Sequence, residues 1–211
     1  ANLNLVLHSE LIAKNEFWGA SSAEIISAKC SGCGDCVKVC RYDAILPNPT
    51  NGDTFQIDPM ACDGCAACVY ACQFDAIEMK QQLEGHWLYS KGDYGMLFHA
   101  ELLPGRENSG KLVSLVKQKA QKWAKVVESP FLIIDGPPGI GCPVIAACVG
   151  VDLALIVAEP GQAGYHDLKR IYSTLHHFRI PTLLCINKAD LYPKGSREIQ
   201  QFAQEEDIKF I

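Results

Sequence analysis

Residues 30–45 read CSGCGDCVKVCRYDAI, and residues 62–77 read CDGCAACVYACQFDAI. The two stretches start 32 positions apart and carry the same pattern, C-x2-C-x2-C-x3-C. The eight cysteines of the two runs are Cys30, Cys33, Cys36 and Cys40, then Cys62, Cys65, Cys68 and Cys72. The copies also share Gly32/Gly64, Val37/Val69, Asp43/Asp75, Ala44/Ala76 and Ile45/Ile77. We therefore treat this segment as one unit present twice.

The spacing of the cysteines has a mechanical reason. Three thiolates two residues apart lie on a tight loop whose amides point inward, which suits a cubane of four irons and four sulfides, but one loop cannot supply the fourth ligand. In two-cluster ferredoxins the last cysteine of each run ligates the other copy's cluster. The spacing thus predicts two [4Fe-4S] clusters, held by Cys30, Cys33, Cys36 and Cys72 and by Cys62, Cys65, Cys68 and Cys40. Gly32 and Gly64 are expected to let the backbone turn close to the inorganic sulfides.

Zinc and disulfide bonds are the other uses of so many cysteines. Structural zinc usually takes two C-x2-C pairs separated by a longer loop, so three evenly spaced cysteines with a remote fourth fit it poorly. The chain has 11 cysteines, an odd number that leaves one outside any set of pairs. The runs depart from common ferredoxins at one point, because Arg41 and Gln73 stand where proline often follows the fourth cysteine. This departure removes no ligand.

Composition limits the kinds of partner. The 211 residues are 20% charged and 48% hydrophobic, and the net charge of −5 gives no support for nucleic-acid binding. Residues 28–80 hold four basic and seven acidic side chains, so a basic patch on a redox partner protein would be steered toward them. No apolar run approaches the roughly 20 residues that span a bilayer. We expect a cytoplasmic protein without a membrane span, in a reducing and oxygen-poor setting.

After the cysteines the pattern changes. Residues 81–104 contain short apolar stretches broken by Gly85, Gly92 and Gly95, which indicate irregular strands and turns. Ser109 is expected to cap a helix with apolar residues at helical spacing over 112–127. Strands are then predicted at 131–135, 152–159 and 182–190, and helices at 143–148, 166–178 and 196–207. Apolar strands separated by helices predict an α/β fold with a mostly parallel sheet.

Two motifs follow predicted strands, where such sheets bind ligands. Asp135 ends the apolar run 131–135 as a Walker B acid does, which orients Mg²⁺ next to a phosphate, and the Gly/Pro-rich loop 136–142 could present amides to a γ-phosphate. A plain strand-to-helix turn is the alternative. The third strand ends in Asn187-Lys188-Ala189-Asp190, an N-K-x-D sequence of the kind that reads the base in GTPases. Four residues recur by chance, and the order after Asp135 gives this motif its weight.

A third motif is rejected. Residues 105–112 read GRENSGKL, close to the phosphate-binding pattern G-x4-G-K-[ST]. Leu112 occupies the place of the hydroxyl that should meet Mg²⁺, and no clear buried strand precedes the segment. We interpret it as a loop and the start of a helix.

Together these residues resemble the MinD/ParA/Mrp (CobQ/CobB/MinD/ParA) group of deviant P-loop ATPases, in the branch with an inserted two-cluster ferredoxin. The resemblance covers nearly the whole chain, through residues 2–5, 28–80, 105–113, 135–142, 159–160, 166–170 and 187–190. It implies an incomplete, mostly parallel sheet of the P-loop NTPase (SIMIBI, MinD-like) type with an inserted bacterial-type ferredoxin-like α+β domain. The implied ranges are 1–27 and 81–211 for the NTPase domain and 28–80 for the insert.

The resemblance also implies site residues and partners. Asp135 would serve Mg²⁺, Gly139 would lie on the γ-phosphate side, and Asn187 would bind the base, usually adenine. The candidate nucleotide-binding residues are Gly139, Glu159, Pro160, Asn187 and Asp190, with Asp135 as the candidate catalytic residue. ATP and Mg²⁺ thus join the two clusters as expected cofactors. Members of the group form nucleotide-sandwich dimers, so we expect a homodimer.

The chain departs from this family in one respect. The family's Walker A loop lies on a first strand, before the point where this sequence begins, and none is present. We expect a fragment of a larger ATPase that is inactive alone. Three functions stay open: electron transfer gated by ATP, a scaffold that assembles or carries clusters, and a ferredoxin module on an inactive NTPase scaffold.

Overall fold

The structure is a computed structural model that describes residues 3–106 and 110–211. The described chain divides into two compact units, which we call the cysteine unit (11–90 and 100–106) and the α/β unit (3–10, 91–99 and 110–211). The range 28–80 predicted from sequence marks the repeated motif, whereas the compact unit also includes strand residues on both sides of it. Within the described residues, no helix is both long and apolar enough to cross a membrane.

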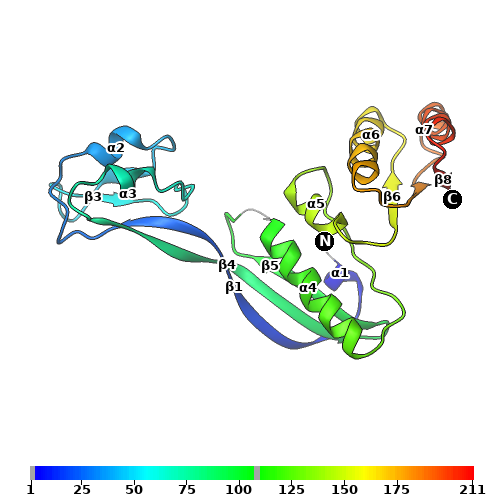
Figure 1. Cartoon of the computed structure of the whole chain (residues 1–211), viewed down its shortest axis with the longest axis horizontal. Coiled ribbons are helices and arrows are strands. Elements are labelled where there is room, and N and C mark those ends of the chain that lie inside the picture. The colour runs from blue at the N-terminus through cyan, green and yellow to red at the C-terminus, as the bar shows by residue number, and fades with distance from the viewer. Residues whose placement is uncertain (1–2, 107–109) are drawn as a thin grey trace. The chain divides into compact units, whose positions relative to one another are not determined.

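The cysteine unit consists of short elements joined to long strands (Figure 1). In chain order the elements are β1 (Ser9–Ile25), α2 (Asp35–Val39), β2 (Ile45–Pro47), β3 (Phe55–Ile57), α3 (Ala67–Ala71), β4 (Ile77–Gly92) and the end of β5 (Gly95–Leu102). Residues 9–10, 91–92 and 95–99 of these strands belong to the α/β unit. β1, β4 and β5 form a sheet in the order β1-β4-β5, and β2 pairs antiparallel with β3. All eight cysteines of the repeat thus lie in the sequence between the end of β1 and the start of β4.

The core of the cysteine unit is small. The buried residues of its cluster beside the cysteines are Ala23, Ile25, Cys36, Ile45 and Ile77, and nine partly buried residues, five of them cysteines of the repeat, pack against them. Helices α2 and α3 have five residues each, so they gain little from helix formation alone. A core of this size usually needs cross-links or metal to be stable.

The α/β unit contains the helices and parallel strands of the second half of the chain. Its elements are α1 (Leu3–Val6), α4 (Gly110–Val126), α5 (Cys142–Cys148), β6 (Ala154–Ala158), α6 (Gln162–His177), β7 (Thr182–Ile186), α7 (Pro193–Glu205) and β8 (Lys209–Phe210). β6, β7 and β8 are parallel neighbours, with Ala154 opposite Thr182 and Leu183 opposite Lys209. The predicted strands at 152–159 and 182–190 and the helices at 166–178 and 196–207 are confirmed, with shifted ends.

The packing of this sheet explains why those predictions succeed. Leu168 and Leu175 of α6, Leu184 of β7 and Ile199 of α7 are each exposed by 2% or less. Their apolar positions recur at the period of the element that carries them, so the pattern reports burial directly. The helix predicted at 112–127 is also confirmed as α4, while its proposed cap, Ser109, lies outside the described residues.

The strand predicted at 131–135 is wrong. These residues have no strand conformation, and the side chains of Phe131 and Ile133 are 82% and 88% exposed. A short apolar run does not by itself distinguish a strand from other extended backbone. A strand also needs a neighbour to satisfy its amides and carbonyls, and this segment is in no sheet of the described chain. Asp135 therefore follows an exposed extended segment.

A buried lysine joins α4 to α5. Lys117 is 8% exposed, and its Nζ donates to the carbonyl oxygens of Ala146, Ala147 and Val149 at 3.3, 2.7 and 2.5 Å. The last carbonyls of a helix have no partner within the helix, and a cation there is favourable. Burial lowers the pKa of Lys117. Lys117 thus serves as the C-terminal cap of α5 from a neighbouring helix.

Replacing Lys117 by methionine should weaken α5 while keeping an apolar stem. The buried carbonyls lose their donors, so we expect a loss of about 1–3 kcal/mol in the free energy of unfolding and faster amide hydrogen exchange in α5. Lys122→Met, on an exposed position of the same helix, is the matched control. Equal α5 protection in the two variants would rule out the capping role.

Candidate functional site

The structure brings the fourth cysteine of the second copy to the first three of the first copy. Cys30, Cys33, Cys36 and Cys72 line one cavity. Its other walls are Ile25, Ser31, Gly34, Phe55, Phe74, Ala76 and Ile77. This is the first ligand set that the spacing predicts, and it contains the crossed cysteine. The second set, Cys62, Cys65, Cys68 and Cys40, stays a prediction built on the same repeat.

The backbone is crossed in the same way as the predicted ligands. The amide of Ile26, before the first cysteine run, donates to the carbonyl of Ala76 after the second run, at 2.7 Å. The amide of Asp58, before the second run, donates to Ala44 after the first, at 2.8 Å. Residues 26 and 58, like 44 and 76, differ by the 32-residue period. The start of each copy is therefore hydrogen-bonded to the end of the other copy.

The repeat extends further than the cysteine pattern shows. Ser22 and Thr54, one period apart, are both buried, with exposures of 4% and 5%. The start of α2 and that of α3 also match: Val37 donates to Gly34 at 3.1 Å and Val69 to Ala66 at 3.0 Å. The structural repeat thus includes residues 21–45 and 53–77, and its first part was missed because it shares few identical residues.

The backbone conformation common to the two copies explains why both have a glycine at the position of Gly32 and Gly64. Gly32 has φ of +72°, and a β-carbon there would lie 2.1 Å from the carbonyl oxygen of Asp53. Gly64 has φ of +74°, and its β-carbon would lie 2.1 Å from the carbonyl oxygen of Ser21. Residues 21 and 53 again differ by one period. The sequence predicted close approach to the sulfides, and the structure adds close approach of each glycine to a backbone carbonyl of the other copy.

Burial differs among the predicted ligands. Cys36 is buried, Cys33 and Cys65 are exposed, and the other five are partly buried. Burial raises the pKa of the Cys36 and Cys68 thiols, so the thiolate needs a positive partner there. The amide of Ala76 donates to Sγ of Cys72 at 3.4 Å, a contact that favours a charged sulfur.

The donor set fits an iron–sulfur cubane. Four thiols line a common cavity, and the loop between the first three has left-handed backbone at Gly32 and Gly34. In the described residues, no three His, Cys, Asp or Glu side chains converge as closely as one metal ion requires. A cubane places its four thiolates on four different irons, so its ligands stand further apart than those of a single ion.

Four of the candidate nucleotide residues follow β6 and β7. Glu159 and Pro160 come directly after β6, and Asn187 to Asp190 come directly after β7. The Nζ of Lys188 lies 2.6 Å from Oε1 of Glu159, and the Asn187 amide donates to the Ala158 carbonyl at 2.9 Å. The parallel strands therefore bring these two segments together at their carboxyl ends. Asp135 and Gly139 lie on another segment, the exposed loop before α5.

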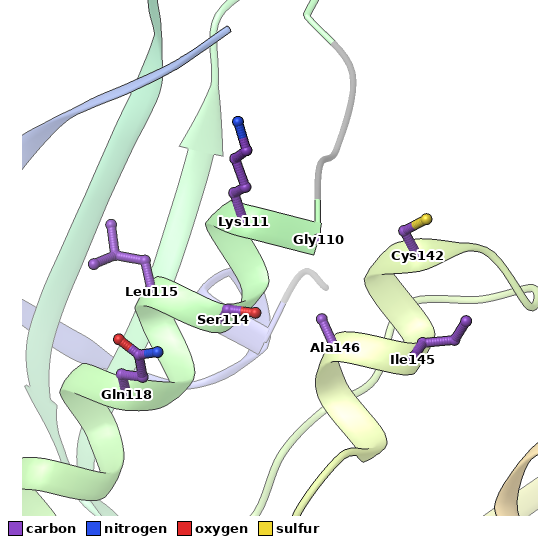
Figure 2. A pocket seen from close by; sticks show the side chains of 8 residues that line it. All are labelled: Gly110, Lys111, Ser114, Leu115, Gln118, Cys142, Ile145 and Ala146. Carbon is purple, nitrogen blue, oxygen red and sulfur yellow. The ribbon is translucent and has the colours of Figure 1, made fainter. Parts of the chain in front are cut away.

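A cavity of about 530 Å³ lies between α4 and α5 (Figure 2). Its lining residues are Gly110, Lys111, Ser114, Leu115, Gln118, Cys142, Ile145 and Ala146. Figure 2 shows Ser114 and Ala146 pointing toward one another across it. The cavity joins the end of the rejected 105–112 motif to the end of the 135–142 loop. Residues 107–109 of that motif lie outside the described residues.

Comparison with known proteins identifies the cysteine repeat. Residues 29–76 match the family model of the 4Fe-4S dicluster domain. This part of the chain is thus a 4Fe-4S dicluster domain, and the prediction of an iron–sulfur protein is confirmed.

Two uncharacterized proteins of Methanocaldococcus jannaschii are similar to the chain. One is 42% identical over 164 residues, which are 77% of this chain and 55% of that protein. The other is 29% identical over 112 residues, 53% of this chain and 40% of that protein. The chain thus spans about half the length of the curated relatives it matches. A solved structure, adenosine 5'-phosphosulfate reductase in complex with substrate, is 19% identical with a TM-score of 0.26, covering 41% of this chain and 70% of that one.

Gly32→Ala should impair cluster binding. The new β-carbon meets the Asp53 carbonyl at a left-handed residue, so the loop must move or bear strain of about 1–3 kcal/mol. We expect less iron and sulfide per chain after anaerobic purification. Gly52→Ala is the matched control, because nothing lies within 4 Å of its β-carbon. Equal iron contents in the two variants would show that the carbonyl contact does not shape the site.

Proposed function

We propose that this protein transfers electrons through two [4Fe-4S] clusters and that a nucleotide bound by the α/β unit controls the transfer. The observation that carries the proposal is the dicluster domain, in which two crossed copies place a fourth cysteine at the first site. When bound, such clusters accept and donate single electrons. A protein that only stored iron would not need two sites closed by each other.

The chain's own residues have three tasks at these sites. The eight thiolates hold the clusters, and the apolar residues Ile25, Ile45 and Ile77 keep water from their inner side. Cys33 and Cys65 are exposed, so each site has one ligand at the surface, where a redox partner protein can approach. The acidic excess of residues 28–80 supports a partner with a basic contact surface.

The nucleotide part of the proposal is supported by the residues after β6 and β7. Carboxyl ends of parallel strands are the usual place for such ligands. The ion pair between Lys188 and Glu159 holds the Asn187 segment against the end of β6. We propose that the side-chain amide of Asn187 and the carboxylate of Asp190 bind the edge of a base. ATP with Mg²⁺ is the ligand we propose, with Asp135 serving the metal and the Gly139 loop the phosphates.

A P-loop fold of the MinD-like type, a homodimer and a cytoplasmic location remain proposals. The parallel order β6-β7-β8 with helices between the strands supports the fold. Leu155 and Val157 on β6 are 52% and 59% exposed, which leaves apolar surface on this sheet that a second copy of the chain could cover.

The coupling is tested on the full-length protein, purified without oxygen and reduced. Stopped-flow absorbance measures the oxidation of its clusters by a one-electron viologen acceptor, with and without Mg-ATP. We expect Mg-ATP to change this rate. Asp135→Asn should lower ATP hydrolysis about 100-fold with little change in ATP affinity, because a misplaced Mg²⁺ no longer stabilises the transition-state charge. Asp152→Asn, at another exposed acid, is the control.

The other outcomes decide between the remaining functions. An unchanged oxidation rate with both clusters intact would contradict nucleotide control and favour a ferredoxin module on an inactive scaffold. Transfer of iron and sulfide to an apo-ferredoxin faster than electron transfer would favour the cluster carrier. Hydrolysis by Asp135→Asn at the rate of Asp152→Asn would remove Asp135 from the reaction.

A further inference from the structure

The repeat allows the two cluster sites to be compared position by position. Phe55 and Phe74 line the cavity of the first site, together with Ser31. One period earlier than the two phenylalanines stand Ala23 and Tyr42, and one period later than Ser31 stands Asp63. The site of Cys62, Cys65, Cys68 and Cys40 therefore has alanine, tyrosine and aspartate where the other has two phenylalanines and serine.

Contacts at the second site agree with this correspondence. The Asp63 carboxylate raises the pKa of Tyr42, first by accepting a hydrogen bond from its hydroxyl and then by its charge, and the charge of Cys65 adds to the effect. Tyr42, Asp63 and Cys65 thus lie together, as their period predicts. Ala23 is buried in the cluster that the cysteines of both sites share, so its place at the second site follows from the 32-residue period.

One pair of equivalent ligands differs in burial. Cys36 of the first site is 8% exposed and buried, whereas Cys68 is partly buried, and the other three pairs are alike. Phe55 and Phe74 give the first site two aromatic rings without polar atoms, whereas the second has one ring, that of Tyr42, which carries a hydroxyl. The first site is therefore the more apolar of the two.

Reduction of a cluster adds one negative charge to a group that is already negative. Apolar surroundings disfavour the more charged form, because they replace water that would stabilise it. Nearby water favours the more charged form, and the Tyr42 hydroxyl favours it by donating to Asp63, which offsets part of the negative charge beside the second site. The charge of Asp63 acts in the opposite sense, but Asp63 is exposed and its effect is screened by water and salt. Desolvation at the first site is then the larger effect.

We propose that the two sites hold their clusters at different reduction potentials, the lower one belonging to the site walled by Phe55 and Phe74. This inference deepens the proposed function and rests on its two crossed clusters. After uptake of one electron by the protein, the electron resides mainly at the site next to Tyr42. Tyr42 and Phe74 ligate neither cluster. Each contributes to this difference in potential by setting the polarity around one of the two sites.

A redox titration of the whole chain tests the proposal. The protein is held at set potentials by an electrode without oxygen, and electron paramagnetic resonance counts reduced clusters. We expect two one-electron steps with at least a tenfold preference for one site, which is 59 mV for a one-electron couple. Phe74→Tyr should raise the lower step alone. Tyr42→Phe, the reciprocal change one period away, should lower the upper step alone.

A third variant separates polarity from packing. Phe74→Leu keeps the wall apolar, so the lower step should stay closer to its original position than in Phe74→Tyr, and it gives a reading if Phe74→Tyr fails to load iron. Two clusters that titrate as one step would overturn the inference and leave the proposed function standing. A shift of the upper step by Phe74→Tyr would also overturn it. Absence of clusters would instead contradict the proposed function.

Discussion

Neither cysteine run can complete a four-iron cluster, and the arrangement of the cysteine unit depends on this constraint. Three thiols come from one tight loop, so the fourth must come from elsewhere, and at the first site it is Cys72 from the other copy. The backbone obeys the same rule, because Ile26 bonds to Ala76 and Asp58 to Ala44. The crossed hydrogen bonds join the two copies beside a small apolar cluster. With the proposed shared ligands, binding of the clusters and folding of the unit would be coupled.

Because the repeat makes the two cluster sites alike in backbone, the side chains that differ between them can be linked to differences between the clusters. Equivalent positions of the two copies have the same backbone conformation. A side chain that differs between the copies therefore changes the surroundings of one cluster without changing its ligands. Asp43 and Asp75 illustrate the shared backbone, since both have positive φ, of 51° and 47°. Phe74 and Tyr42 illustrate the divergence. A protein with two clusters of one type can in this way give each its own potential through neighbouring side chains.

Sequence alone predicts those features that a local pattern determines. Cysteine spacing predicted the iron–sulfur domain and placed Cys72 with the first run, whose cavity it lines. Apolar periodicity predicted α6, β7 and α7, where Leu168, Leu184 and Ile199 are buried. Other features depend on contacts between distant residues. No local sequence pattern predicts that the Asp53 carbonyl lies against Gly32 or that Lys117 caps α5. The full extent of the repeat is not visible in the sequence either. The segment 131–135 looks like a strand because it is apolar, yet a strand also requires a partner.

The most direct test of the account is the mass of the intact protein, purified without oxygen and measured by native mass spectrometry. Two crossed [4Fe-4S] clusters predict an added mass of about eight irons and about eight sulfides per chain. Loss of one cluster in Cys40→Ala should leave the three cysteines of the first run and Cys72 fully loaded. A mass with zinc in place of iron, or with no added sulfide, would contradict the account.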